Sequence, residues 1–200
     1  MRSEGIALWW QPARLAGDMT NGMDVIDVSA LRIEGIFISP GHNFFGHHEK
    51  PSGTHPTISV SEIECVAGKG LFGDRFFGFK ENYKGQVTFF SSEVFEDVCR
   101  KLNVVEKSPG VTRRNVVTRG VDLNSLVGKK FVIQRIEFEG VSECSPCHWM
   151  NEAIAPGAEA LLHGRGGLRA RILSDGVLRV DGDESPNRTD KTYATYGALR

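Results

Sequence analysis

The sequence lacks long hydrophobic runs and has almost no net charge. No apolar stretch approaches the roughly 18 to 20 residues of a membrane-spanning helix. Residues 6–10 are also too few for the hydrophobic core of a secretory signal peptide, which takes about 7 to 15 residues. A formal net charge of −1 gives no overall field that would gather nucleic acid or an anionic membrane. We therefore expect a cytoplasmic protein that binds neither nucleic acid nor membrane.

Cysteine is scarce, and its four copies do not indicate a disulfide framework. Cys65 and Cys99 are far apart in the sequence, and in a reducing compartment such residues are expected as free thiols. Cys144 and Cys147 form a C-x-x-C-H string with His148. This string occurs in haem attachment, in half of a structural zinc site and in dithiol redox pairs, and it can also hold one reactive thiolate beside a bystander.

Two of these uses fit the rest of the sequence poorly. Attachment of haem would require export from the cytoplasm, and no export signal is visible, so we expect no haem. A closed zinc site needs four ligands, and no second paired motif follows at the usual spacing, although His47 and His48 could contribute through the fold. A thiolate is a strong nucleophile and a soft metal ligand, and a charged His148 could stabilise it. The string therefore indicates sulfur chemistry but leaves the choice among its uses open.

Short strand-like segments separated by turns make up most of the chain. The patterns predict two modest helices, over residues 91–102 and 158–163, and strands over residues 31–38, 57–66, 86–90, 111–120, 131–141, 168–173 and 177–180. There is no regular alternation of strands with helices and no repeat of about 20 to 50 residues. We therefore predict a mainly β fold, specifically a mostly antiparallel barrel.

One domain over residues 31–183 accounts for the predicted strands. Residues 1–30 lack a sustained period and are expected to form a loosely ordered extension, and residues 184–200 a polar tail. Asp175 and Gly176 are a hairpin signal between the last two predicted strands.

Charged and amide side chains lie beside the predicted turns and strands. A turn with three glycines ends at Asp74 and Arg75, which could cap the turn or meet an anion, although the turn lacks the ending of a phosphate loop. Arg113, Arg114 and Asn115 stand at the entry of a β-branched strand. Their forked donors and amide could hold a phosphate, a carboxylate or a planar heterocycle, or could simply lie on the surface.

Taken together, these segments resemble the MOSC domain, which is found at the C-terminal end of molybdenum-cofactor sulfurases and in amidoxime-reducing molybdenum enzymes. The resemblance covers about residues 57–183. It rests on the succession of residues 73–75, 113–117, 120–123, 144–147 and 166–173, followed by Gly176 and residues 182–183.

The resemblance implies a β-barrel related to the one inserted in pyruvate kinase, and a pocket for molybdenum cofactor, a pterin with a dithiolene and a terminal phosphate. By motif position, Cys147 would be the catalytic cysteine, which either carries sulfur as a persulfide or binds molybdenum directly. Cys144 would be a secondary or resolving thiol, with His148 beside it. At the level of the family there is also an association with pyridoxal phosphate.

The same resemblance assigns roles to the charged segments. Arg113, Arg114 and Asn115 would hold the phosphate or the pterin, and Asp74 and Arg75 would lie near the same face. We expect both strand arginines at the rim of the pocket.

Three functions stay open from the sequence. The first is a small molybdenum-dependent reductase of N-hydroxylated bases or amidoximes, in which Cys147 ligates the metal. The second is a non-catalytic carrier that holds a persulfide on Cys147 for a metal-sulfur centre. The third is a redox or zinc-stabilised interaction module that uses both thiols. The aminotransferase-like domain of the larger relatives is missing, so we expect a sulfur donor or an electron-transfer protein in trans, a small-molecule substrate, and allow for a homodimer.

Overall fold

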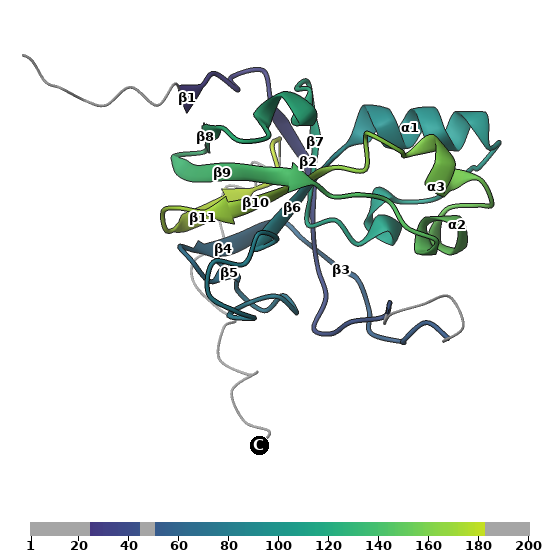
Figure 1. Ribbon diagram of the computed structural model, residues 1–200, viewed down its shortest axis with the longest axis horizontal. Helices are drawn as coiled ribbons and strands as arrows, with labels where there is room; N and C mark the ends of the chain where they lie inside the picture. Colours follow the sequence, from purple (N-terminus) through teal and green to yellow (C-terminus); the bar gives the residue numbers. More distant parts are fainter. Residues whose placement is uncertain (1–24, 45–50, 183–200) are drawn as a thin grey trace, which may run out of the picture.

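Strands dominate the chain and form two sheets (Figure 1). The computed structural model describes residues 25–44 and 51–182. The larger sheet has the order β1 (Val25–Ile26), β8 (Lys130–Ile133), β9 (Ile136–Glu143), β10 (Leu168–Ile172), β6 (Val87–Ser91), β7 (Val116–Arg119), β2 (Arg32–Ile38) and β3 (Ile58–Val60). The smaller has the order β11 (Gly176–Arg179), β4 (Glu62–Val66) and β5 (Gly70–Leu71).

Most of these pairs are antiparallel, with β1–β8 and β6–β7 parallel among the described strands. The expected mainly β, largely antiparallel fold is confirmed. The strands of both sheets surround one core, although hydrogen bonding between the described strands is interrupted where the two sheets meet.

Alternation of buried and exposed residues explains how the strands share this core. In β10 and in residues 136–140 of β9, every second residue is buried, because successive side chains of a strand point to opposite faces. The fully buried rings of Phe89, Phe131 and Phe138 lie at its centre, with ring centroids 5.4 to 5.8 Å apart. Each such ring stabilises the fold by about 1.5 to 3 kcal/mol through burial.

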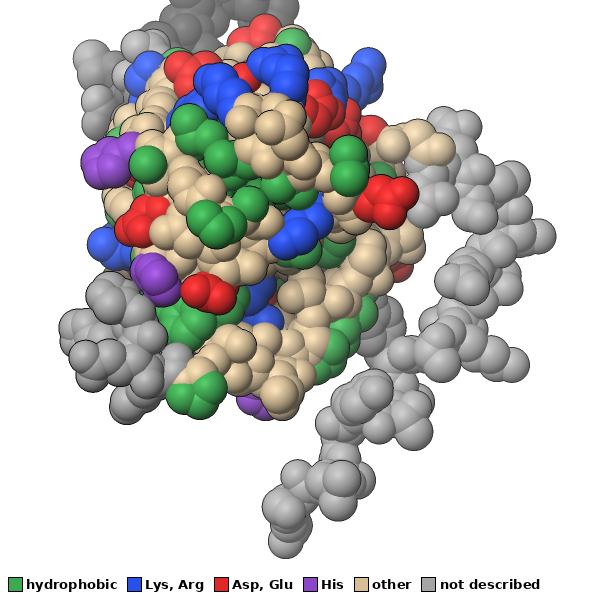
Figure 2. Space-filling view, turned by 90° about the vertical axis from the view of Figure 1, so that its right-hand side faces the viewer, with side chains coloured by type: hydrophobic (Ala, Val, Ile, Leu, Met, Phe, Trp, Pro, Cys, Tyr) green, Lys and Arg blue, Asp and Glu red, His purple; other side chains and the backbone are tan. Residues whose placement is uncertain are grey.

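A second hydrophobic cluster joins three helices to the sheet. Helices α1 (Ser92–Lys101), α2 (Trp149–Ala153) and α3 (Ala158–Leu161) lie together at one end of the molecule, hereafter the helical end (Figure 1). The two helices predicted from the sequence are confirmed as α1 and α3. At α1, the Ser91 hydroxyl accepts a hydrogen bond from the Val94 N–H at 3.1 Å, which caps the helix. Figure 2 shows this end, where basic, acidic and hydrophobic side chains are interspersed.

The last two strands do not form the predicted hairpin. β10 pairs with β9 and β6, whereas β11 pairs with β4 in the smaller sheet. The carboxylate of Asp175 accepts a hydrogen bond from the Ala67 N–H at 2.7 Å, which ties the turn to the end of β4. A Cβ on Gly176 would lie 2.5 Å from Ile136. The Asp-Gly pair therefore marks a crossing between the two sheets.

Part of the expected N-terminal extension belongs to the fold. β1 pairs with β8, and Val28 is 8% exposed and packs in the main core. Residues 1–24 and 183–200, which include most of the two predicted end segments, lie outside the described residues, as do His47 and His48. Within the described part of the chain, no helix is long and apolar enough to cross a membrane.

Two 3-10 helices, η1 (Pro109–Thr112) and η2 (Leu123–Leu126), flank β7. The strand register then places the ends of β9, β10 and β7 in one row with the middle of β6. Glu143 of β9 pairs with Leu168 of β10, Leu168 pairs with Phe89 of β6, and Phe89 pairs with Val116 of β7. The segment after β9 and the segment before β7 therefore emerge at the same edge of the sheet, facing the helical end.

Candidate functional site

The register brings the cysteine string and the basic segment together. Residues 144–148 leave the end of β9, and residues 113–115 enter β7, with β10 and β6 lying between the two strands. A direct contact joins them, because the Arg114 guanidinium donates from Nη2 to the Cys144 carbonyl oxygen at 3.0 Å. The sequence predicted that these two segments share a site, and the structure places them side by side.

Asp74 and Asn115 are buried and bonded to each other. Asp74 is 6% exposed, and its carboxylate accepts hydrogen bonds from the backbone N–H groups of Ser39 and Phe76 and from the Asn115 amide, at 3.1 to 3.2 Å. The Asn115 amide also donates to the Phe37 carbonyl and accepts from the N–H and hydroxyl groups of Thr88. With their polar atoms engaged by protein groups, both side chains hold the frame of the site.

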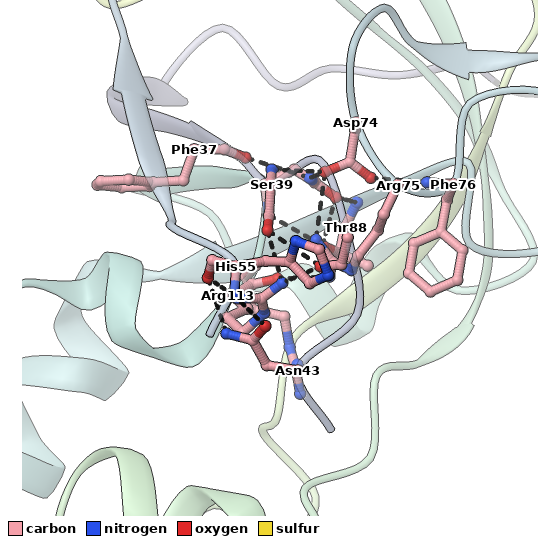
Figure 3. A network of polar contacts seen from close by, with 12 residues as sticks. Phe37, Ser39, Asn43, His55, Asp74, Arg75, Phe76, Thr88 and Arg113 are labelled. Carbon is pink, nitrogen blue, oxygen red and sulfur yellow. Dashed lines mark hydrogen bonds and ion pairs between the residues drawn. The ribbon is translucent and has the colours of Figure 1, made fainter. Parts of the chain in front are cut away.

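Arg75 and Arg113 belong to the same polar network (Figure 3). Arg75 donates to the Asp74 carboxylate and to the Arg113 carbonyl, each at 3.2 Å. Arg113 is 7% exposed and donates to the Ser39 hydroxyl at 2.7 Å and the Gly41 carbonyl at 2.6 Å. Burial, together with the charge of Arg75, lowers the pKa of Arg113 to about 10. Most of the Arg113 side chain is therefore buried against protein acceptors, deeper than the rim position that the sequence suggested, although Arg113 also lines the cleft described below.

The two consecutive arginines point in different directions. Arg113 has a left-handed backbone with φ 56° at the end of η1, a conformation that is uncommon for a non-glycine residue. Arg114 follows this turn and donates from Nε to the Gly166 carbonyl at 3.1 Å as well as to Cys144. Arg113 thus holds the segment around Ser39, whereas Arg114 holds the segment around Cys144.

The two thiols of the string differ in environment. Cys144 is buried at 4% exposure, and its N–H donates to the Gly167 carbonyl at 2.7 Å. Cys147 is exposed just before α2. His148 is partly exposed and lies 3.5 Å from the Glu152 carboxylate. All four cysteines, including Cys65 and Cys99, are free thiols.

Arg169 and Tyr83 also belong to the site, although the sequence assigned no role to either. Arg169 donates from Nε to the Cys144 sulfur at 3.5 Å. Burial by itself lowers the pKa of Arg169, but the hydrogen bond with Cys144 and the interactions with Cys144, Tyr83 and Cys147 outweigh it, so this pKa is raised. Burial raises the pKa of Tyr83. The strand over residues 168–173 was predicted. Only the register of β10 with β9, however, puts Arg169 beside residues 144–148, hereafter the cysteine loop.

A cleft of about 620 Å³ lies beside the exposed thiol segment. Phe44 stacks on Trp149 with ring centroids 4.7 Å apart, and Arg113, His148 and Glu152 also line the cleft. The cleft is large enough for a small planar molecule, since ligand pockets usually measure about 300 to 1,000 Å³.

The side chains of this site suit a bound molecule that carries a metal and an anionic group better than they suit a closed metal site. Among the described residues, no group of three or more His, Cys, Asp and Glu side chains gathers to hold a metal ion. The exposed thiol of Cys147 can instead supply one soft ligand to a metal that another molecule carries. The guanidinium groups of Arg114 and Arg169, next to the same loop, suit an anionic group on that molecule. These residues therefore fit molybdenum cofactor.

The family model described as the MOSC domain matches residues 67–184. Among solved structures, the chain is similar to the YUAD protein of Bacillus subtilis, with 18% identity and a TM-score of 0.59, over 75% of this chain and 91% of that one. It is also similar to YiiM of Geobacillus stearothermophilus, with 15% identity and a TM-score of 0.53, over 74% and 71% of the two chains. No curated protein matches. At these identities, the solved structures support the fold alone.

Proposed function

The chain belongs to the MOSC domain family, and from this premise we propose that it handles sulfur at a molybdenum-cofactor site, carrying a sulfane sulfur as a persulfide on Cys147. The observation that supports this proposal best is an exposed thiol, Cys147, three residues after a buried thiol, Cys144, that a guanidinium contacts. An exposed thiol can accept sulfur from a partner protein, because a large molecule can reach it.

Each site residue has a role in this proposal. Arg114 and Arg169 would hold the anionic part of the cofactor, because both lie against the cysteine loop. Asp74 and Asn115 keep the strand ends and Arg75 in place through their buried hydrogen bonds. When bound, the cofactor would supply a metal that takes sulfur ligands. The protein's own contribution is to bind, to orient the thiol and to keep positive charge next to it.

The cleft beside His148 favours a second candidate, a reductase of N-hydroxylated compounds. Its stacked wall of Phe44 and Trp149 suits a flat substrate, and Glu152 could meet a cationic amidine or base. In this reading, Cys147 ligates the metal, and electrons come from a separate protein. A sulfur donor or electron-transfer partner, assembly as a homodimer and location in the cytoplasm all stay predictions.

Analysis of protein purified from a cofactor-competent host separates the two candidates. The carrier predicts a cyanide-labile sulfur that is lost in Cys147→Ser and kept in Cys144→Ser. The reductase predicts stoichiometric molybdenum that disappears in Cys147→Ser. Cys99→Ser is the matched control, since Cys99 is a partly buried thiol on α1. If every form of the protein lacked both molybdenum and labile sulfur, both candidates would be contradicted.

A further inference from the structure

The buried thiol of Cys144 has a chemical use that the carrier function leaves open. A persulfide holds its outer sulfur at oxidation state zero, whereas metal-sulfur centres contain sulfide. A metal-sulfur centre needs the sulfur as sulfide. Its delivery in that form therefore requires two electrons. A second thiol beside the persulfide can supply them by thiol–disulfide chemistry.

The structure holds Cys144 in place from three sides. Its N–H donates to the Gly167 carbonyl at 2.7 Å, and its carbonyl accepts from Arg114 at 3.0 Å. A Cβ on Gly166 would lie 2.5 Å from the same carbonyl oxygen, so the backbone of Gly166 packs directly against it. The side chain of Cys144 is held as well, because the Arg169 guanidinium donates a hydrogen bond to its sulfur at 3.5 Å. A buried thiol with such fixed contacts is suited to attack a neighbour and poorly suited to accept sulfur from a large partner.

The charge of Arg169 interacts with both Cys144 and Cys147. Arg169 comes from β10, whereas the two thiols follow β9. The C-x-x-C spacing of the thiols is the one that dithiol redox proteins use to form a disulfide. A guanidinium placed there can donate a hydrogen bond to a hydrosulfide anion as it leaves.

We propose that Cys144, positioned by Arg169, releases the sulfur carried on Cys147 as hydrosulfide. This inference rests on the proposed function, which supplies the persulfide. The Cys144 sulfur attacks the inner sulfur of the Cys147 persulfide, a Cys144–Cys147 bond forms, and the bond to the outer sulfur breaks. The outer sulfur gains two electrons and the proton of the Cys144 thiol and leaves, while the two cysteine sulfurs are oxidised to a disulfide. A dithiol reductant then restores both thiols by exchange.

The test loads the reduced full-length protein with inorganic polysulfide and removes the excess. Released hydrosulfide, protein-bound cyanide-labile sulfur and the Cys144–Cys147 disulfide are then measured together, the last by peptide mass spectrometry without reduction. In the wild type, hydrosulfide and disulfide should appear in equal amounts. Cys144→Ser should keep its labile sulfur on Cys147.

Substitutions at Arg169 separate positioning from folding. Arg169→Met should load sulfur as the wild type does but release it roughly tenfold more slowly, as expected for losing a hydrogen bond from a charged group. Arg169→Lys should recover part of the rate. Arg171→Met is the matched control, two residues along the same strand and paired with Glu139, and should release at the wild-type rate.

Two results would overturn the inference while leaving the carrier intact. One is a wild-type persulfide that persists beside a reduced Cys144, and the other is undiminished release from Cys144→Ser. Failure of Cys147 to take up sulfur in any variant would instead overturn the proposed function, and the release step with it.

Discussion

The guanidinium of Arg114 and the carbonyl oxygen of Cys144 lie 3.0 Å apart and join the entry of β7 to the exit of β9. The same side chain also donates to the Gly166 and Thr112 carbonyls. Arg114 therefore holds the cysteine loop in position, whatever it binds in addition.

Replacing Arg114 with Met should loosen this loop without unfolding the protein. We expect the stability to fall by about 1 to 3 kcal/mol, because hydrogen bonds from a charged donor are lost. We also expect faster hydrogen exchange at the Cys144 N–H, which is bonded to Gly167. Arg32→Met at the exposed start of β2 is the control. Equal hydrogen-exchange rates of the Cys144 N–H in the two variants would show that Arg114 does not hold the loop in position.

Asp74 should be far more important for stability than an exposed carboxylate. Asp74→Ala leaves the donors of Ser39, Phe76 and Asn115 without an acceptor and Arg75 without its ion-pair partner. A loss of about 3 to 5 kcal/mol in urea unfolding is expected, as for other buried pairs from which one partner is removed.

Glu62→Ala removes the partner of an exposed Arg179 and should cost no more than about 1 kcal/mol. Similar losses in Asp74→Ala and Glu62→Ala would mean that the buried network around Asp74 contributes little.

Local features of the fold could be predicted from the sequence, and features that depend on long-range pairing could not. Helix α1 was predictable because its cap, Ser91, and its buried face, Phe95 and Val98, are close in sequence. The Asp175–Gly176 turn was misinterpreted as a hairpin because the partner of β11 is β4, more than a hundred residues earlier, and local turn preference cannot select it.

The candidate site shows the same division. The sequence predicted which segments share the site, and Arg114 and Cys144 are in contact. It could not predict that Arg113 and Asn115 turn inward, because the acceptors they meet come from residues 37–41, in β2 and just after it. Arg169 was missed for a related reason, since its contact with Cys144 depends on the register between two strands.

Gly166 should tolerate a methyl group less well than its neighbour Gly164. Gly164 has φ 75° and open space around its Cα, so Gly164→Ala should cost about 1 kcal/mol through backbone strain alone. In Gly166→Ala, the new Cβ would lie 2.5 Å from the Cys144 carbonyl oxygen and 2.9 Å from Pro146. The loop must move, at a cost of about 2 to 3 kcal/mol.

Thermal unfolding and the alkylation rate of Cys147 check this pair of variants together. The alkylation rate should change in Gly166→Ala and stay at the wild-type value in Gly164→Ala. An unchanged rate in both would mean that the position of the thiol does not depend on the close packing of Gly166 against the Cys144 carbonyl.

Cys65 should make the protein sensitive to alkaline pH. Its side chain is fully buried in β4, and burial raises its pKa from 9.0 to about 12. The unfolded chain therefore loses this proton at a lower pH than the folded protein. The stabilising contribution is complete below pH 9.0 and is lost as the pH rises through the folded value of about 12. The slope cannot exceed about 1.4 kcal/mol per pH unit for one proton.

Urea unfolding of the wild type and Cys65→Ala at several values between about pH 8 and about pH 10 measures this contribution, since that range spans the onset of ionisation of an exposed thiol. The variant loses packing at every pH, but it has no thiol to ionise. The stability advantage of the wild type should therefore shrink as the pH rises above 9.0. Other alkaline groups titrate in both proteins and cancel in the comparison. A difference in stability that stays constant over this range would mean that Cys65 ionises as readily in the folded chain as in the unfolded one.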